Sequence, residues 1–256
     1  MRIVILANNW VGWQVTEWLS QREEEIVGLI VHPLEAQKYS NEIISSASID
    51  SSLIFNGSTI HAPENIEKIK SLRPDIAISL LFDYILKPVF IDIFPQGVIN
   101  LHPAYLPYNR GQYPNVWSII EGTPAGTTLH FIDAGIDTGE IIARELVNVE
   151  PVDTGKTLNQ KLAKASLDLF KVTWPTILSG SFQRLSQNIE DGTYHKTEDV
   201  QGIDEIDLDE YYKAKTLINI LRARTFPPYK GAYFIQNGKK VYLRLQLLNE
   251  AQMEDN

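Results

Sequence analysis

The chain has 256 residues, 44% of them hydrophobic and 21% charged, which is typical of a globular protein with one well-buried core. Its formal net charge is −9 and no run of lysine and arginine exceeds two residues, which disfavours a nucleic-acid partner. The absence of cysteine excludes disulfides, thiolate metal sites and a cysteine nucleophile, and it fits a cytoplasmic location.

Short apolar runs alternate with amphipathic segments along the first 180 residues. The apolar residues at 3–6 are too few to span a membrane and are interpreted as a first strand, so no membrane partner is expected. A helix at 11–20, a strand at 26–31, a weakly patterned stretch at 34–55, a helix at 63–72 and a strand at 76–81 follow. Next come a strand at 98–102, a helix at 114–121, a strand at 127–132 and a long helix at 157–178. This alternation predicts an α/β fold built on a doubly wound, mainly parallel sheet.

The pattern changes after Gly180. A helix is predicted at 211–224, with acidic residues before its start and basic residues at its end, as the helix dipole favours. Strands at 232–235 and 241–248 flank Asn237-Gly238, a strong signal for a tight hairpin turn. We therefore predict two domains, 1–180 and a small C-terminal extension of a helix and a β-hairpin at 181–256. Because two strands alone are marginal in water, the hairpin is expected to pair with a second copy, giving a homodimer.

Polar side chains interrupt two of the predicted strand ends. Asn100 and His102 are two residues apart in one strand, so they lie on the same face, at the carboxyl end where open α/β sheets bind ligands. Asp133 and Asp137 lie in the glycine-containing segment that follows the strand at 127–132. Each pair alone is compatible with a structural role, a hydrogen-bonded core pair or a connecting turn. Their occurrence on neighbouring strand ends favours a functional site.

The motifs resemble those of a known family. Residues 100–107, 110–111, 126–130 and 137–141 resemble, in order and spacing, the signature of the 10-formyltetrahydrofolate-dependent formyltransferases. The resemblance covers about the first 180 residues, and 76–142 carry most of it. It implies a Rossmann-like fold, 10-formyltetrahydrofolate as the cofactor, and a catalytic trio of Asn100, His102 and Asp137.

Formyl transfer to an amine needs a proton acceptor, stabilisation of an oxyanion and a proton for the departing nitrogen. Asn100 has an amide N–H that can donate to the oxyanion. His102 can take the proton of the attacking amine, because an imidazole titrates near neutral pH. Asp137 would orient and charge-stabilise that imidazole. Which group moves which proton stays open.

The resemblance also implies cofactor contacts. Residues 79–86 are similar to the segment that holds the pterin in these enzymes, although the same residues also read simply as a buried strand that turns into a helix. The contacts expected on this basis are Phe82, Tyr84, Ile85, Leu86 and, through its loop, Asp133.

Departures from the family pattern bear on the formyl acceptor. Methionyl-tRNA formyltransferases usually carry a larger C-terminal domain, and the acidic charge of this chain is wrong for a phosphate backbone. Enzymes that act on glycinamide ribonucleotide usually have a glycine-rich turn where this chain has Asn8, Asn9 and bulky Trp10. Residues 106–115 and 221–234 instead resemble the nucleotide-sugar N-formyltransferases. The favoured acceptor is a nucleotide-linked amino sugar, commonly a 4-amino-4,6-dideoxyhexose, whose product would enter lipopolysaccharide or another glycan.

Aromatic and polar residues near these segments are candidate substrate contacts, because rings stack on sugars or bases and polar groups bond hydroxyls or phosphates. Trp10 and Tyr105 also fit an ordinary packing role. The candidates are Asn9, Trp10, Tyr105, Tyr108, Asn109, Arg110 and Gln112.

Other functions remain alternatives. A methionyl-tRNA formyltransferase-like enzyme, a formyltetrahydrofolate hydrolase that uses water in place of the amine, and a non-catalytic binding module share the fold. A dinucleotide oxidoreductase is disfavoured because no Gly-x-Gly-x-x-Gly follows the first strand. No metal is predicted, since His102 and His130 lie on separate strands and lack the helical spacing of a zinc motif.

Overall fold

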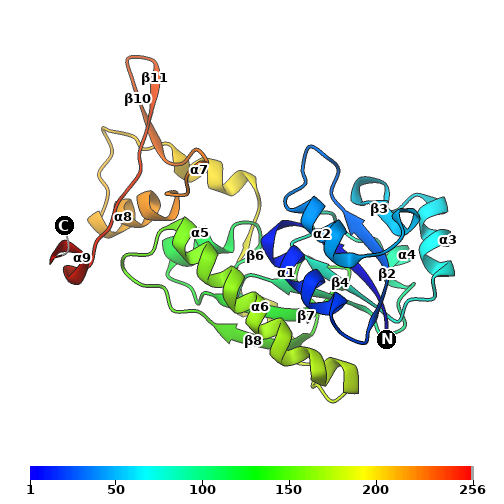
Figure 1. The fold of residues 1–256 in the computed structure, drawn as a ribbon. Coiled ribbons are helices and arrows are strands. Elements are labelled where there is room, and N and C mark those ends of the chain that lie inside the picture. The colour runs from blue at the N-terminus through cyan, green and yellow to red at the C-terminus, as the bar shows by residue number, and fades with distance from the viewer. Residues whose placement is uncertain (255–256) are drawn as a thin grey trace. The chain divides into compact units, whose positions relative to one another are not determined.

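The computed structural model describes residues 1–254 (Figure 1). They form two compact units. The first contains residues 1–102, 127–145 and 163–187, and the second contains residues 103–126, 146–162 and those from 188 onward. Because each unit combines separate stretches of sequence, the units do not coincide with the predicted domains 1–180 and 181–256, which stay a prediction.

A seven-stranded sheet organises the first unit. Its order is β3-β2-β1-β4-β5-β7-β8, with parallel pairing from β3 through β5 and antiparallel pairing between β5 and β7. This confirms the doubly wound, mainly parallel α/β sheet, in which the order of the strands reverses between β1 and β4. The strands are β1 (Arg2–Ala7), β2 (Glu25–Val31), β3 (Ile54–Asn56), β4 (Ile76–Leu80), β5 (Val98–His102), β7 (Gly126–Phe131) and β8 (Ile141–Leu146).

The sequence pattern did not reveal the two edge strands. β3 has only three residues and follows a serine-rich stretch, so it carries no measurable alternation. β8 follows the glycine-containing loop, and its last three residues are exposed. An edge strand buries fewer side chains than a central strand, so the hydrophobic period that reveals a strand is weak there.

Helices cover both faces of the sheet (Figure 1). Ile3 and Ile5 of β1 face one hydrophobic cluster, whereas Val4 and Leu6 face a second, as the two-residue period of a strand requires. The first cluster is covered by α1 (Asn9–Ser20), α2 (Ser40–Ala47) and residues 163–179 of α6 (Gly155–Ser179). The second is covered by α3 (Pro63–Ser71) and α4 (Pro88–Ile91). Two buried faces explain why the central strands are apolar throughout.

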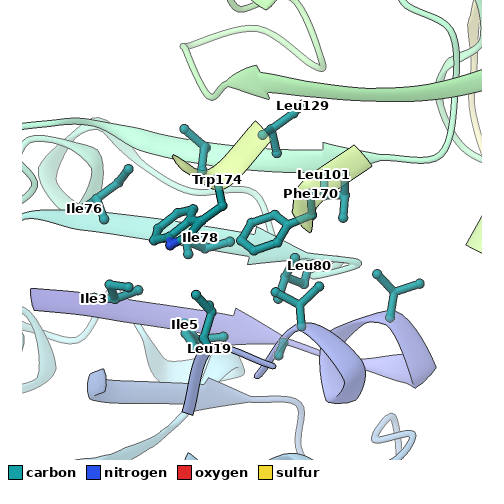
Figure 2. Close-up of a cluster of buried hydrophobic side chains, with 14 of the residues drawn as sticks. Ile3, Ile5, Leu19, Ile76, Ile78, Leu80, Leu101, Leu129, Phe170 and Trp174 are labelled. Carbon is teal, nitrogen blue, oxygen red and sulfur yellow. The ribbon is translucent and has the colours of Figure 1, made fainter. Parts of the chain in front are cut away.

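Two aromatic rings of α6 fill the centre of the first cluster. Phe170 and Trp174 are fully buried and stack with their ring centroids 5.2 Å apart. Figure 2 shows both rings over the strand side chains Ile78 and Leu80. The indole Nε1 of Trp174 donates a hydrogen bond of 2.9 Å to Glu24 Oε1, so its polar atom is satisfied although the ring is buried.

The second unit contains the predicted C-terminal helix and hairpin. α5 (Pro114–Glu121) packs against α8 (Ala214–Ala223), and a two-residue strand β6 (Arg110–Gly111) pairs in parallel with β9 (Tyr194–His195). Its core contains Trp117, Leu158 and Ala223. The remaining elements are α7 (Gln201–Asp204), β10 (Tyr233–Gln236), β11 (Lys239–Tyr242) and α9 (Glu250–Glu254).

Two details of this unit differ from the prediction. α8 begins at Ala214 rather than at residue 211, and its first turn contains no acidic residue. Of the acidic residues before it, Asp204 pairs with Arg224. The second hairpin strand ends at Tyr242 rather than at residue 248. The predicted turn is confirmed, since Asn237 and Gly238 both have the positive φ angles, 50° and 72°, that a type I′ hairpin turn needs.

Among residues 1–254, no helix combines the length and the apolar character that crossing a membrane would require.

The Trp174→Ala substitution should lower the free energy of unfolding by about 3–5 kcal/mol, because it leaves a cavity and removes the partner of Glu24. Val172→Ala on the same helix is the matched control, since Val172 is 72% exposed; it should change the value by less than about 0.5 kcal/mol. Urea denaturation measures both, and equal losses would contradict the central place of Trp174 in the core.

Candidate active site

The ends of β1, β2 and β4 meet at the switch point of the sheet. Buried Asn8, directly after β1, accepts a hydrogen bond from Lys38 N at 2.7 Å, and its amide nitrogen lies 3.0 Å from His32 Nδ1. On the other side of the imidazole, Asp83 N lies 3.3 Å from His32 Nε2. His32 thus joins the first strand to the segment after β4.

The imidazole of His32 is kept neutral by its surroundings. Burial lowers the pKa of His32 below its ordinary value of 6.5, although the exposed Asp83 carboxylate acts in the opposite sense. The rings of Phe82 and Tyr84 lie edge-on to it, with centroids 5.1 and 5.2 Å away. A neutral histidine therefore supports the aromatic segment that follows β4.

The antiparallel pairing of β5 with β7 brings Asn100 and His130 together. These residues are direct partners in the register, so their side chains share a face of the sheet. Asn100 Nδ2 lies 3.2 Å from His130 Nε2, and His130 Nδ1 lies 2.8 Å from the carbonyl oxygen of Phe131. His102, two residues further along β5, is opposite Thr128.

Asp137 links the two histidines. Its Oδ2 lies 3.6 Å from His102 Nε2, and its Oδ1 lies 3.6 Å from His130 Nε2. All three side chains are largely buried, with 14% of the Asp137 side chain, 9% of that of His102 and 1% of that of His130 exposed. The single carboxylate of Asp137 thus lies close to both imidazoles.

The loop from 133 to 140 holds Asp137 in place. Asp133 Oδ1 accepts hydrogen bonds from Gly135 N at 3.0 Å and from the Thr138 hydroxyl at 2.6 Å. Gln187 Nε2 donates to the carbonyls of Asp137 at 3.0 Å and Gly139 at 2.6 Å.

The backbone of this loop is also constrained at two positions. A side chain at position 139 would place a Cβ 1.9 Å from the Phe131 carbonyl oxygen, so only glycine fits there. Asp137 itself has a φ of 53°, which is uncommon for a residue with a side chain and frequent at functional sites.

A donor amide, an imidazole and a carboxylate are the groups that formyl transfer to an amine requires. Residues 1–172 match the family model for formyl transferase, and residues 199–249 match that for the N-formyltransferase dimerization C-terminal domain. The chain belongs to the formyl transferase family. This confirms the family expected from the motifs.

Several relatives of this formyltransferase are known. It is 29% identical to a 4-N formyltransferase from Francisella tularensis, whose crystal structure it matches with a TM-score of 0.83 over 97% of this chain and 98% of that one. The formyltransferase PseJ from Anoxybacillus kamchatkensis, solved with UDP-4,6-dideoxy-4-formamido-L-AltNAc and tetrahydrofolate, is 31% identical, with a TM-score of 0.57 over 79% of this chain and 89% of that one. The methionyl-tRNA formyltransferase of Geotalea daltonii is 28% identical over 253 residues, which are 94% of this chain and 78% of that protein.

The structure brings the residues of the expected trio together in the first unit of this formyltransferase. The sequence did not assign a role to His130, which contacts Asn100 and Asp137, or to Gln187, which holds the loop of Asp137. It also gave no role to Asn8 and His32, which join β1 to the segment after β4. His130 is the last residue of the motif at 126–130, and its position opposite Asn100 follows only from the strand register. Among residues 1–254, no cluster of three or more metal-binding side chains is arranged to hold a metal ion.

The expected cofactor contacts differ in exposure. Ile85 is 76% exposed, Phe82 and Tyr84 are half-buried with centroids 5.4 Å apart, and Leu86 is buried in the second hydrophobic cluster. Asp133 shapes the loop of Asp137 as described above. Their contact with a cofactor stays a prediction.

The expected substrate contacts lie in different units. Asn9 and Trp10 begin α1 in the first unit, and Trp10 packs against the core. The second unit holds Tyr105, Tyr108 and Arg110, all half-buried, together with exposed Gln112 and buried Asn109.

Asn109 is buried, and its expected contact with a substrate stays a prediction. Its side chain has no exposed surface, and its amide donates hydrogen bonds of 2.9 Å to the hydroxyls of Ser118 and Thr123. The Thr193 hydroxyl donates to its Oδ1 at 3.2 Å. The polar groups of Asn109 therefore serve the packing of the second unit.

Gln187→Ala should lower the kcat of formyl transfer by about 10–100-fold, because the loop that positions Asp137 loses two hydrogen bonds while the core is untouched. The matched control is Gln183→Ala, which removes an exposed glutamine from the same segment. Steady-state kinetics with a thermal melt of each variant make the comparison; an unchanged kcat for Gln187→Ala would contradict the role of this contact.

The stability of the protein should fall as the pH decreases below about 6.5, since the unfolded chain then binds a proton that neutral, buried His32 does not. The contribution of His32 to the free energy of unfolding is therefore present above the pKa that His32 has in the unfolded chain. It is lost as the pH falls toward the lower pKa that His32 has in the folded protein. The pKa of His61 is also lowered by burial, so part of the dependence should remain in a His32→Gln variant. Urea unfolding at about pH 7.5 and about pH 5.5 tests this, and equal losses in the two proteins would contradict it.

Proposed function

We propose that this formyltransferase transfers the formyl group of 10-formyltetrahydrofolate to the amine of a nucleotide-linked amino sugar, with a 4-amino-4,6-dideoxyhexose as the favoured acceptor. The observation that carries the proposal is the convergence of Asn100, His102 and Asp137 on one edge of the sheet in a member of this family. A product of this kind would serve the synthesis of lipopolysaccharide or another glycan.

Each residue of the trio has one task. The amide N–H of Asn100 donates to the oxygen that becomes negative when the amine attacks the formyl carbon. His102 takes the proton that the amine loses, and Asp137 stabilises the positive charge on that imidazole from 3.6 Å. When bound, 10-formyltetrahydrofolate supplies the formyl carbon and accepts a proton on the nitrogen that the formyl group leaves.

The segment after β4 fits a flat, partly apolar cofactor. It follows the switch point of the sheet, where open α/β folds bind ligands. Ile85 and Val89 of this segment are 76% and 53% exposed, and exposed apolar side chains suit the face of a pterin. We propose that this segment holds the folate.

Charge and fold both support a sugar nucleotide as the acceptor. The match to the 4-N formyltransferase extends along nearly the whole of both chains. The net charge of −9 opposes the binding of tRNA. In the second unit, Arg110 Nε is buried and has no hydrogen-bond partner among residues 1–254, so a phosphate group would satisfy it.

We also propose a homodimer. The match of residues 199–249 to a dimerization domain supports it, and the hairpin β10-β11 carries exposed apolar side chains at Ile235, Val241 and Tyr242. An exposed two-stranded hairpin of this kind gains stability when a second copy covers it.

The test is a formyl-transfer assay with 10-formyltetrahydrofolate, a panel of nucleotide-linked 3-amino and 4-amino sugars, and charged initiator methionyl-tRNA, with folate release followed throughout. We expect transfer to a nucleotide-linked 4-amino sugar. His102→Ala and Asp137→Asn should each lower kcat by about 10²-fold or more while sugar-nucleotide binding stays largely intact. Asp92→Asn, an exposed carboxylate of the same unit, is the control that should keep full activity.

The other outcomes contradict the proposal in different ways. Transfer to methionyl-tRNA alone would assign the function of the Geotalea relative. Folate release without an acceptor would indicate a hydrolase. Full turnover in His102→Ala would overturn the assigned roles even if a sugar is the acceptor.

A further inference from the structure

His130 is almost completely buried beside the trio, and formyl transfer as described above gives it no task. Its side chain is 1% exposed and stands directly opposite Asn100 in the β5–β7 register. A buried histidine in contact with the proposed oxyanion donor must affect how that donor is presented.

The contacts of the His130 ring determine which nitrogen carries hydrogen. Nδ1 lies 2.8 Å from the Phe131 carbonyl oxygen, which can only accept, so Nδ1 must be the N–H. In the neutral ring, Nε2 is then an acceptor with a free lone pair. Asn100 Nδ2 lies 3.2 Å from Nε2 and donates to it.

This contact fixes the orientation of the Asn100 amide. If the amide were turned by half a rotation, its Oδ1 would face the lone pair of Nε2, and both atoms would be acceptors. With Nδ2 toward the histidine, one amide hydrogen is used and the second remains available. We infer that His130 is a positioning residue that holds Asn100 with its second amide N–H ready to donate to the developing oxyanion, an inference that rests on the proposed function.

Asp137 and His102 are the titratable neighbours of His130. Asp137 Oδ1 lies 3.6 Å from Nε2, and the ring of His102 is edge-on at a centroid distance of 6.3 Å. A protonated His130 would donate from Nε2, and Asn100 would have to present its oxygen instead. It would also compete with His102 for the single carboxylate of Asp137. With Nε2 accepting from Asn100, the Asp137 carboxylate is left to His102, whose Nε2 lies 3.6 Å from Oδ2.

Two substitutions separate positioning from packing. His130→Leu keeps an apolar volume and removes the acceptor, whereas His130→Gln supplies a carbonyl oxygen that can accept from Asn100. We expect His130→Leu to lower kcat by about 30-fold or more, near the effect of losing an oxyanion donor, and His130→Gln to restore it to within about fivefold of the wild type. The KM values for both substrates should change by less than about threefold.

A double-mutant cycle tests whether His130 acts through Asn100. In an Asn100→Ala background, His130→Leu should cost less than about threefold in kcat, because the amide it positions is already gone. Independent losses in the two variants, or a glutamine that rescues no better than leucine, would overturn the inference.

The ring tautomer gives a readout that does not depend on catalysis. The chain has only five histidines, so a long-range ¹H–¹⁵N spectrum of the unliganded protein can resolve the ring nitrogens of each one. The His130 signals are assigned by their loss in the His130→Gln variant. A neutral ring protonated at Nδ1 supports the inference, and a ring protonated at Nε2 overturns it. A wild-type protein that transfers no formyl group would refute the proposed function, while the spectrum would still decide whether His130 orients Asn100.

Discussion

The chemistry of this formyltransferase depends on the register between β5 and β7, the one antiparallel step next to the parallel part of the sheet. Pairing Asn100 with His130 places an amide against an imidazole whose other nitrogen is bound to the Phe131 carbonyl. A slip of one residue would turn the Asn100 side chain to the opposite face. The buried apolar residues on both sides of these strands hold the register, so the hydrophobic core also fixes the polar geometry.

The loop that carries Asp137 shows how an unfavourable backbone is maintained beside a rigid sheet. Asp137 has a positive φ, and residues in that region cost free energy that the surroundings must offset. Hydrogen bonds to the loop offset this cost. Asp133 closes the turn through Gly135 and Thr138, and Gln187 donates two bonds to the loop carbonyls. The carboxylate is thereby held near both histidines.

Much of the fold was predictable because it follows from local periodicity. The central strands, the helices α1, α3 and α5, the long helix α6 and the Asn237-Gly238 turn all stand close to their predicted positions. The failures have one cause, which is weak burial. β3 and β8 are edge strands, and α2 lies in the serine-rich stretch where polar residues obscure the apolar face. α8 starts at Ala214, three residues after its predicted start.

For the site, the sequence by itself determined which groups are present and that Asn100 and His102 share a face, since the two-residue period of a strand is a local property. The family motif added Asp137. The tertiary structure alone decided that His130 stands opposite Asn100, that Asp137 lies between two imidazoles, that Gln187 holds its loop and that Asn109 is buried. The contact of His130 with Asn100 joins residues 30 positions apart, and that of Gln187 with Asp137 joins residues 50 positions apart. They depend on strand register and loop backbone conformation, which emerge only when the core packs and which no local pattern of side chains encodes.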